Sequence, residues 1–221
     1  MKKFRFTGIG LLCTAAVCVG SATVGGFSLA QNQTPDLKPS VEKGKLLFEK
    51  SCMGCHGENG NSTQPNRPKL AGQLPGYLTG QLTILKQGIR PSPVMNPIAG
   101  NLSTDDINNV VAFLSSQKAK ATFKPTDSAQ VAKGKTLFLE GRPTEGVLAC
   151  AICHGSNGEG FASSGAPRIA NQSPGYVLRI LGVFKAAPKF EVAHPAAMKV
   201  AVSPLSDDDL KAVTEYLSSL E

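Results

Sequence analysis

The sequence contains no tryptophan and only three tyrosines, and aromatic residues make up 6% of its 221 positions. Since a half-chain of about 100 residues needs bulky side chains to bury enough surface, each half would have a thin core built from side chains alone. Of the six cysteines, Cys13 and Cys18 stand in an N-terminal apolar stretch, and the other four form two closely spaced pairs. No cysteine is left over for a disulfide, a separate zinc site or a further cysteine ligand.

A basic run with interleaved aromatic residues, which is typical of nucleic-acid-binding surfaces, is also absent from the sequence. The formal net charge is +7, but removing Lys2, Lys3 and Arg5 leaves 20 basic against 16 acidic residues, a net charge of +4. Residues 36–120 hold ten basic and six acidic side chains, whereas residues 121–221 hold ten of each. We therefore expect no nucleic-acid partner, and we place the basic surplus in the first half.

The N-terminus has the features of an export signal. After the basic start, an apolar run extends over Gly8–Val24, and Ser28–Ala30 offers small residues at the positions that a signal peptidase recognises. We predict a signal peptide over residues 1–30, a mature chain that begins at Gln31, and a periplasmic location. The alternative is an uncleaved membrane anchor, because Phe6–Ala30 is long enough to span a bilayer.

A five-residue motif, Cys-x-x-Cys-His, occurs twice in the chain, 98 positions apart. Two thiols three positions apart match the reach of a porphyrin's two vinyl groups, and the following histidine can bind the iron. The motifs supply Cys52, Cys55 and His56, and then Cys150, Cys153 and His154. The pattern predicts two covalently bound haem c groups.

A Cys-x-x-Cys pair also occurs in two other kinds of site. A redox dithiol of the thioredoxin type does not need the following histidine and normally occurs once. A zinc site with four cysteines would usually have its two pairs roughly 15–20 residues apart, much closer than these. Both alternatives therefore explain the repeated motif less well than haem attachment does.

The sequence around the two motifs is also repeated, which indicates an internal duplication. Before the motifs, Gly44–Phe48 resembles Gly134–Phe138 at an offset of 90, so about eight residues near Gly141–Val147 are inserted ahead of Cys150. We expect this insert to form a surface loop. After the motifs the offset is 98 or 99, in the pairs Gly57–Gly60 with Gly155–Gly158, Pro68–Ala71 with Pro167–Ala170, and Pro75–Tyr77 with Pro174–Tyr176.

Helical signals recur in both halves. Ser40 can cap a helix that runs into the first motif, and the corresponding helix of the second half is expected over Gln130–Glu140. Further helices are expected over Tyr77–Gln87 and Tyr176–Phe184. Each half closes with an amphipathic helix that starts at a capping box, namely Ser103 with Asp106 and Ser206 with Asp209.

These patterns predict an all-α fold of two tandem helical domains with one haem each. The predicted domains are residues 31–120 and residues 121–221, and Lys118–Ala129 forms the linker between them.

A haem held by one histidine has a second axial position, and its ligand distinguishes an electron carrier from an enzyme. Met95 and Met198 each lie eight residues before a capping serine, in a proline-rich stretch that we expect to be a loop. This matched placement favours both as axial ligands, whereas the alternative is that they fill the core. His194 is the remaining histidine and could replace Met198, but its counterpart in the first half is Pro91.

The quoted residues resemble the class I c-type cytochromes, and the duplicated chain with its leader resembles dihaem cytochromes of the c4 type. The resemblance implies that the first and last helices of each lobe cross at Gly44 and Gly134, with Phe113 and Tyr216 packed nearby. It also implies that the carbonyl groups of Pro68 and Pro167 hold the haem-binding imidazoles.

The resemblance further implies outer-sphere electron transfer in a periplasmic respiratory chain, from a quinol-oxidising complex to a terminal oxidase or a similar acceptor. The expected partners are redox proteins, peripheral association with a membrane stays open, and no enzymatic activity is expected. One alternative is an electron-transfer subunit of a periplasmic dehydrogenase. The other is a dihaem enzyme, which would need an open or unusually ligated iron.

Overall fold

The computed structural model describes residues 38–187 and 193–221, so the predicted signal peptide lies outside the described residues. Within them the chain is helical, and its only β-type pairings are two isolated bridges, Arg142 with Val147 and Phe161 with Ala166. The prediction of an all-α fold is confirmed. All of the described helices belong to one compact unit, Lys38–Glu221.

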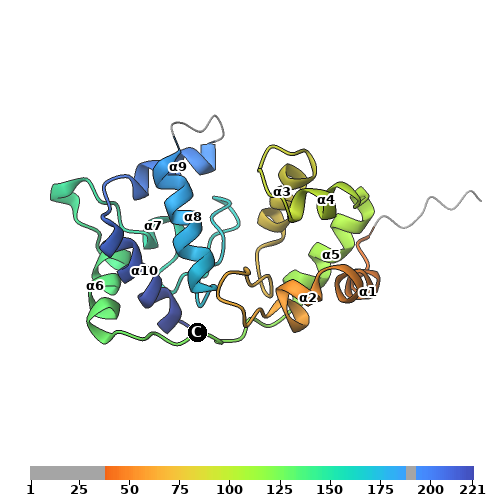
Figure 1. Ribbon diagram of the computed structural model, residues 1–221, viewed down its shortest axis with the longest axis horizontal. Coiled ribbons are helices and arrows are strands. Elements are labelled where there is room, and N and C mark those ends of the chain that lie inside the picture. The colour runs from red at the N-terminus through yellow and green to blue at the C-terminus, as the bar shows by residue number, and fades with distance from the viewer. Residues whose placement is uncertain (1–37, 188–192) are drawn as a thin grey trace, which may run out of the picture. The chain divides into compact units, whose positions relative to one another are not determined.

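We call the helices on either side of the linker the first and second lobes (Figure 1). The first lobe comprises α1 (Val41–Ser51), α2 (Met53–His56), η1 (Glu58–Gly60), α3 (Pro75–Lys86), α4 (Met95–Gly100) and α5 (Thr104–Ser116). The second lobe comprises α6 (Ser128–Leu139), η2 (Pro143–Glu145), α7 (Ala151–His154), α8 (Pro174–Ala186), α9 (Ala193–Val202) and α10 (Asp207–Ser219).

In each lobe the first helix crosses the last one at a glycine, as expected. A Cβ atom on Gly44 would lie 1.9 Å from the carbonyl oxygen of Asn109 in α5, and one on Gly134 would lie 1.9 Å from that of Ala212 in α10. Only glycine lets the two backbones approach this closely. The aromatic rings beside the crossings pair at centroid distances of 5.4 Å and 5.3 Å, Phe48 with Phe113 and Phe138 with Tyr216.

The apolar faces of the closing helices form the two cores. In α5 the buried side chains follow helical spacing, and the same holds for α10, because one stripe of each helix faces its own lobe. The predicted capping boxes of Ser103 with Asp106 and Ser206 with Asp209 are both present. The buried apolar side chains in these helices are Ile107, Val110, Val111, Phe113 and Leu114, and Leu210, Ala212, Val213, Tyr216 and Leu217.

Three predicted helix starts were wrong by two residues. Helices α3 and α8 begin at Pro75 and Pro174, because proline suits the first helical turn, where its missing N–H is not needed. Helix α6 begins at Ser128, because the Asp127 carboxylate caps it by accepting from the N–H groups of Ala129 and Gln130. The segment between α5 and α6 is therefore residues 117–127.

The two methionines lie in short helices, which corrects the prediction of loops. Met95 is the first residue of α4, where its N–H donates to the Ser92 hydroxyl at 3.1 Å. Met198 lies inside α9 and packs against the core of the second lobe. Pro97 and Pro195 lie in the first turns of these helices, where proline is tolerated, so they do not prevent helix formation.

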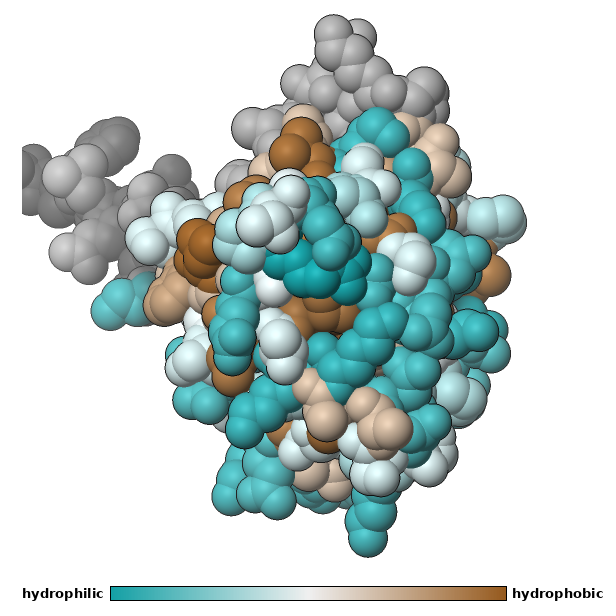
Figure 2. Space-filling view, turned by 90° about the vertical axis from the view of Figure 1, so that its left-hand side faces the viewer, coloured by the Kyte–Doolittle hydropathy of each residue, from teal (hydrophilic) through white to brown (hydrophobic). Residues whose placement is uncertain are grey.

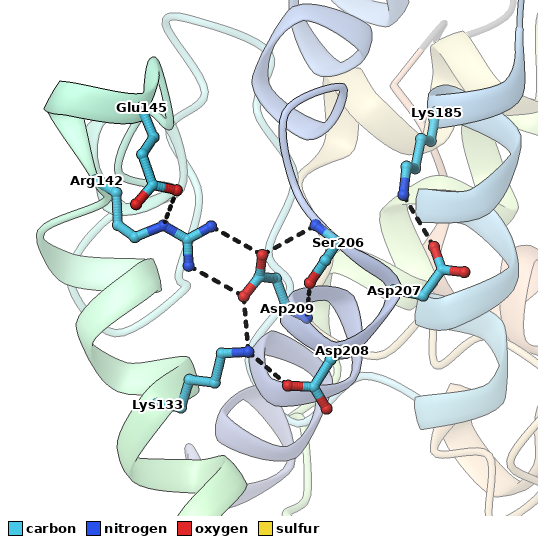
Figure 3. A network of polar contacts seen from close by, with 8 residues as sticks. All are labelled: Lys133, Arg142, Glu145, Lys185, Ser206, Asp207, Asp208 and Asp209. Atoms are coloured by element: carbon cyan, nitrogen blue, oxygen red, sulfur yellow. Dashed lines mark hydrogen bonds and ion pairs between the residues drawn. The ribbon is translucent and has the colours of Figure 1, made fainter.

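The insert ahead of Cys150 is exposed at Pro143–Gly146, as expected of a surface loop, and its two ends are anchored to the second lobe. Val147 is buried in the core, and Arg142 forms two hydrogen bonds with the Asp209 carboxylate, at 3.1 Å and 2.9 Å (Figure 3). Lys133 of α6 lies 2.8 Å from the same carboxylate, which is only 2% exposed. The hydrogen bonds from Arg142 hold the pKa of Asp209 far below its usual range.

The linker is hydrogen-bonded to both lobes. The Asn61 side chain of the first lobe forms hydrogen bonds with the backbone of Lys118 and Lys120. The Asn171 side chain of the second lobe forms hydrogen bonds with the backbone of Thr122 and Phe123. These bonds satisfy backbone groups of a segment that has no helix or strand of its own.

Hydrophilic side chains dominate the face of the molecule on the side of α6, with smaller apolar patches between them (Figure 2). In the part of the chain that the structure describes, no helix combines the length and the hydropathy needed to cross a bilayer.

Candidate functional site

The four cysteines of the two motifs are unpaired thiols at the starts of α2 and α7. Cys52 and Cys150 are half-buried against the cores of their lobes, whereas Cys55 and Cys153 are exposed. Burial, together with the neighbouring cysteine, raises the pKa of Cys52 to about 11, and burial raises that of Cys150 to about 11 as well.

These raised pKa values bear on the alternatives. A redox dithiol and a zinc ligand both require a thiolate, which is favoured by a lowered pKa. Among residues 38–187 and 193–221, no group of three or more histidine, cysteine, aspartate or glutamate side chains is arranged to hold a metal ion. Cys52 and Cys150 pack against the apolar cores of their lobes, a position that suits the attachment of an apolar macrocycle.

The two motif histidines have matching environments. The Nδ1–H of His56 donates to the carbonyl oxygen of Pro68 at 2.9 Å, and that of His154 donates to the carbonyl oxygen of Pro167 at 3.0 Å. Both side chains are buried, with 7% and 6% exposure, and burial lowers the pKa of each. Each imidazole is therefore neutral at pH 7, oriented through Nδ1, and free of hydrogen bonds at Nε2 within the described residues.

These environments fit a haem group in each lobe. The bond from Nδ1 to a backbone carbonyl fixes the tautomer in which Nε2 carries the lone pair that an iron ion needs. Met95 and Met198 are half-buried, as a thioether ligand beside an apolar cofactor would be. The side chain of His194, the rival ligand, lies outside the described residues.

Two glutamines that the sequence reasoning did not single out join the lobes. The Gln73 side-chain amide accepts a hydrogen bond from the N–H of Arg168 and donates one to its carbonyl oxygen. The Gln172 amide does the same with the backbone of Lys69. A signal was available, because Gln73 and Gln172 stand 99 positions apart at the same place in the repeat. Repetition alone, however, does not reveal that each side chain reaches into the other lobe.

The fold and the site define this chain as a tandem c-type cytochrome. The family model described as "Cytochrome c" matches twice, over residues 41–118 and 131–221. The chain therefore belongs to the cytochrome c family.

Relatives narrow the assignment within this family. A cytochrome c4 from Pseudomonas aeruginosa is 36% identical over 169 residues, which are 76% of this chain and 83% of that protein. A thiosulfate dehydrogenase electron acceptor from Stutzerimonas stutzeri is 30% identical over 173 residues, 77% of this chain and 79% of that protein.

A solved structure agrees with these matches. The crystal structure of reduced recombinant cytochrome c4 from Pseudomonas stutzeri aligns with a TM-score of 0.76 and 31% identity, covering 83% of this chain and all of that one. The resemblance to dihaem cytochromes of the c4 type is confirmed. The chain carries two covalently bound haem c groups and is a dihaem electron-transfer cytochrome, with Cys52 and Cys55, and Cys150 and Cys153, in the two attachment motifs.

Proposed function

We propose that the chain carries electrons in the periplasm, from a quinol-oxidising complex to a terminal oxidase or a similar acceptor. Haem c supplies the one-electron chemistry. In this proposal residues 1–30 are the signal peptide, and residues 31–120 and 121–221 are the two haem domains. No catalytic residue is proposed.

The observation that carries the proposal is the matched orientation of two buried imidazoles. His56 and His154 are proposed as axial ligands, with the Pro68 and Pro167 carbonyl groups fixing their rings. Met95 and Met198 are proposed as the opposite ligands. A thioether opposite an imidazole favours the ferrous state and leaves no axial position for a substrate, as a carrier requires.

A second candidate is an electron acceptor bound to a dehydrogenase. It is favoured by the relative that is a thiosulfate dehydrogenase electron acceptor. It is also favoured by a solved thiosulfate dehydrogenase from Marichromatium purpuratum, which has a TM-score of 0.74 and 28% identity. This chain covers 82% of its own length but 40% of that protein, so the match includes only part of the enzyme. Co-elution of the native protein with a dehydrogenase would favour this candidate.

The test of the proposed ligands counts the haems and probes their axial positions. Intact mass and a pyridine haemochrome assay should give two covalent haems per chain, and the ferrous protein should not take up carbon monoxide. Met95→Ala and Met198→Ala should each remove the weak methionine-to-iron absorption of one haem and leave its covalent attachment intact.

Two results would contradict these assignments. Ready uptake of carbon monoxide by one haem of the unmodified protein would indicate an enzyme with an open iron. If the spectrum of the second haem changes in His194→Ala but not in Met198→Ala, then Met198 is not its ligand.

A further inference from the structure

The peptide group between Pro68 and Lys69 has a partner on each side. Its carbonyl oxygen accepts the Nδ1–H of His56 at 2.9 Å, and its N–H donates to Oε1 of Gln172 at 2.7 Å. Because both bonds share one conjugated peptide group, they join the first lobe's histidine to a side chain of the second lobe.

The second lobe contains the same arrangement in reverse. The peptide group between Pro167 and Arg168 accepts the Nδ1–H of His154 at 3.0 Å, and its N–H donates to Oε1 of Gln73 at 2.8 Å. Each motif histidine is therefore linked, through one peptide group, to a glutamine from the opposite lobe.

Both glutamines are held firmly in place. Nε2 of Gln172 donates to the Lys69 carbonyl oxygen at 3.0 Å, and Nε2 of Gln73 donates to that of Arg168 at 2.8 Å. Each Oε1 atom also accepts the N–H of the next residue in its own chain segment, at 2.8 Å from Ser173 and 2.9 Å from Leu74. The side chains are buried, with 5% exposure for Gln73 and 8% for Gln172.

The junction between the lobes leaves little room for water. Its cavity has a volume of about 10 Å³ and is lined by Lys69, Ala71, Gln73, Ala119, Arg168, Ala170 and Gln172. That volume is about enough for a single water molecule. In such surroundings hydrogen bonds are electrostatically stronger than in water, and bonds in a chain polarise one another.

We propose that Gln172 tunes the electron affinity of the first lobe's haem, and that Gln73 tunes that of the second lobe's haem. When Oε1 accepts the peptide N–H, the carbonyl oxygen at the other end of that peptide becomes a better acceptor. The imidazole then donates Nδ1–H more strongly and becomes a more basic ligand, which favours ferric iron. This inference rests on the proposed axial roles of His56 and His154.

The experiment uses the full-length dihaem protein with the paired variants Gln172→Met and Gln73→Met. Redox titration followed by NMR, with resonances assigned to each lobe, gives the ferrous-to-ferric ratio of each haem at a fixed applied potential. Loss of the glutamine Oε1 acceptor should raise the ferrous-to-ferric ratio by about threefold at the haem of the lobe opposite the substitution. The ratio should rise by less at the haem of the substituted lobe. Each variant serves as the matched control for the other.

A second variant changes the acceptor in the opposite sense. In Gln172→Glu one carboxylate oxygen replaces Oε1 as a stronger acceptor of the Lys69 N–H, while the bond from Nε2 to the Lys69 carbonyl oxygen is lost. The ferrous-to-ferric ratio of the first haem should therefore fall, and by more than that of the second haem. This variant keeps the test informative if a methionine at this position disrupts the junction.

The proposal is tested by which of the two haems changes its ferrous-to-ferric ratio in each variant, and in which direction. Unchanged potentials, equal changes at both haems, or a change confined to the variant's own lobe would overturn the proposal. A change of the first haem in the same direction in Gln172→Met and Gln172→Glu would also overturn it, because both variants lose the bond from Nε2 to the Lys69 carbonyl oxygen and loosened packing would then explain the shift. Failure of the proposed axial ligation is recognised separately, since it would show in the haem spectra of the unmodified protein.

Discussion

At the scale of single residues, equivalent positions of the repeat have different environments. Asp106 and Asp209 occupy the same position in the capping boxes of α5 and α10. Asp106 is only half-buried, and its carboxylate accepts hydrogen bonds from Ser103. Asp209 is buried and binds Arg142 and Lys133 in addition to its capping serine.

This difference predicts a lobe-specific response to acid. The folded-state pKa of Asp209 is depressed, so its contribution to stability is complete above its unfolded pKa of about 4 and is lost as the pH falls below it. Asp209→Asn should lower the melting temperature at pH 7 and make stability depend less on pH below about 4. Thermal unfolding followed by circular dichroism at pH 7 and at acidic pH would measure both effects.

Asp106→Asn is the matched control for this experiment. It removes the same capping carboxylate without disturbing an ion cluster, so its effect at pH 7 should be smaller. Equal losses in the two variants would mean that Arg142 and Lys133 add nothing to the stability of the second lobe.

At the scale of helices, close approach at one glycine decides how each lobe is assembled. Helix α6 packs mainly on α10, and α1 packs mainly on α5. The contact brings Gly134 so close to Ala212 that no side chain fits between the two backbones. Gly182 in helix α8 makes no such close contact, because open space lies where its Cβ atom would be.

Gly134→Ala should therefore lower the free energy of unfolding by about 3 kcal/mol, since the added methyl group must push two backbones apart. Gly182→Ala, the control, should leave stability unchanged or raise it by about 0.5 kcal/mol, because alanine favours a helix. Urea unfolding of the two variants would test this. Similar stabilities for both would show that α6 and α10 are not packed as closely as described.

At the scale of the whole molecule, the basic surplus lies in the first half of the chain. Each haem adds the charge of its propionates to its own lobe, so the difference between the lobes is unchanged. An acidic redox partner should therefore approach the first lobe more readily. The effect depends on ionic strength, because the distance over which charges are screened falls from about 30 Å at 0.01 M salt to about 8 Å at 0.15 M.

Lys45 and Lys135 offer a matched pair for testing this expectation, because they are exposed and occupy equivalent places in α1 and α6. Lys45→Glu should slow electron transfer to a small acidic redox protein more than Lys135→Glu does, and the difference should shrink as salt is added. Stopped-flow kinetics at low and physiological ionic strength would measure both rates. Equal slowing by the two variants would contradict docking at the first lobe.

Local sequence patterns were enough to predict the haem-attachment motifs and the helical plan. Cysteine spacing, the following histidines and the 98-residue repeat predicted two covalent haems, and the capping boxes placed the starts of α5 and α10 correctly. These features could be predicted because covalent attachment and helix capping depend on residues only a few positions apart.

The contacts between residues far apart in the sequence could be seen in the folded chain alone. The tertiary structure placed Met95 and Met198 in short helices, buried Asp209 under the insert, and brought Gln73 and Gln172 to the peptide groups behind the opposite histidines. These contacts join residues up to 103 positions apart. They exist because two copies of one surface face each other across the junction, and local sequence patterns do not encode such an arrangement.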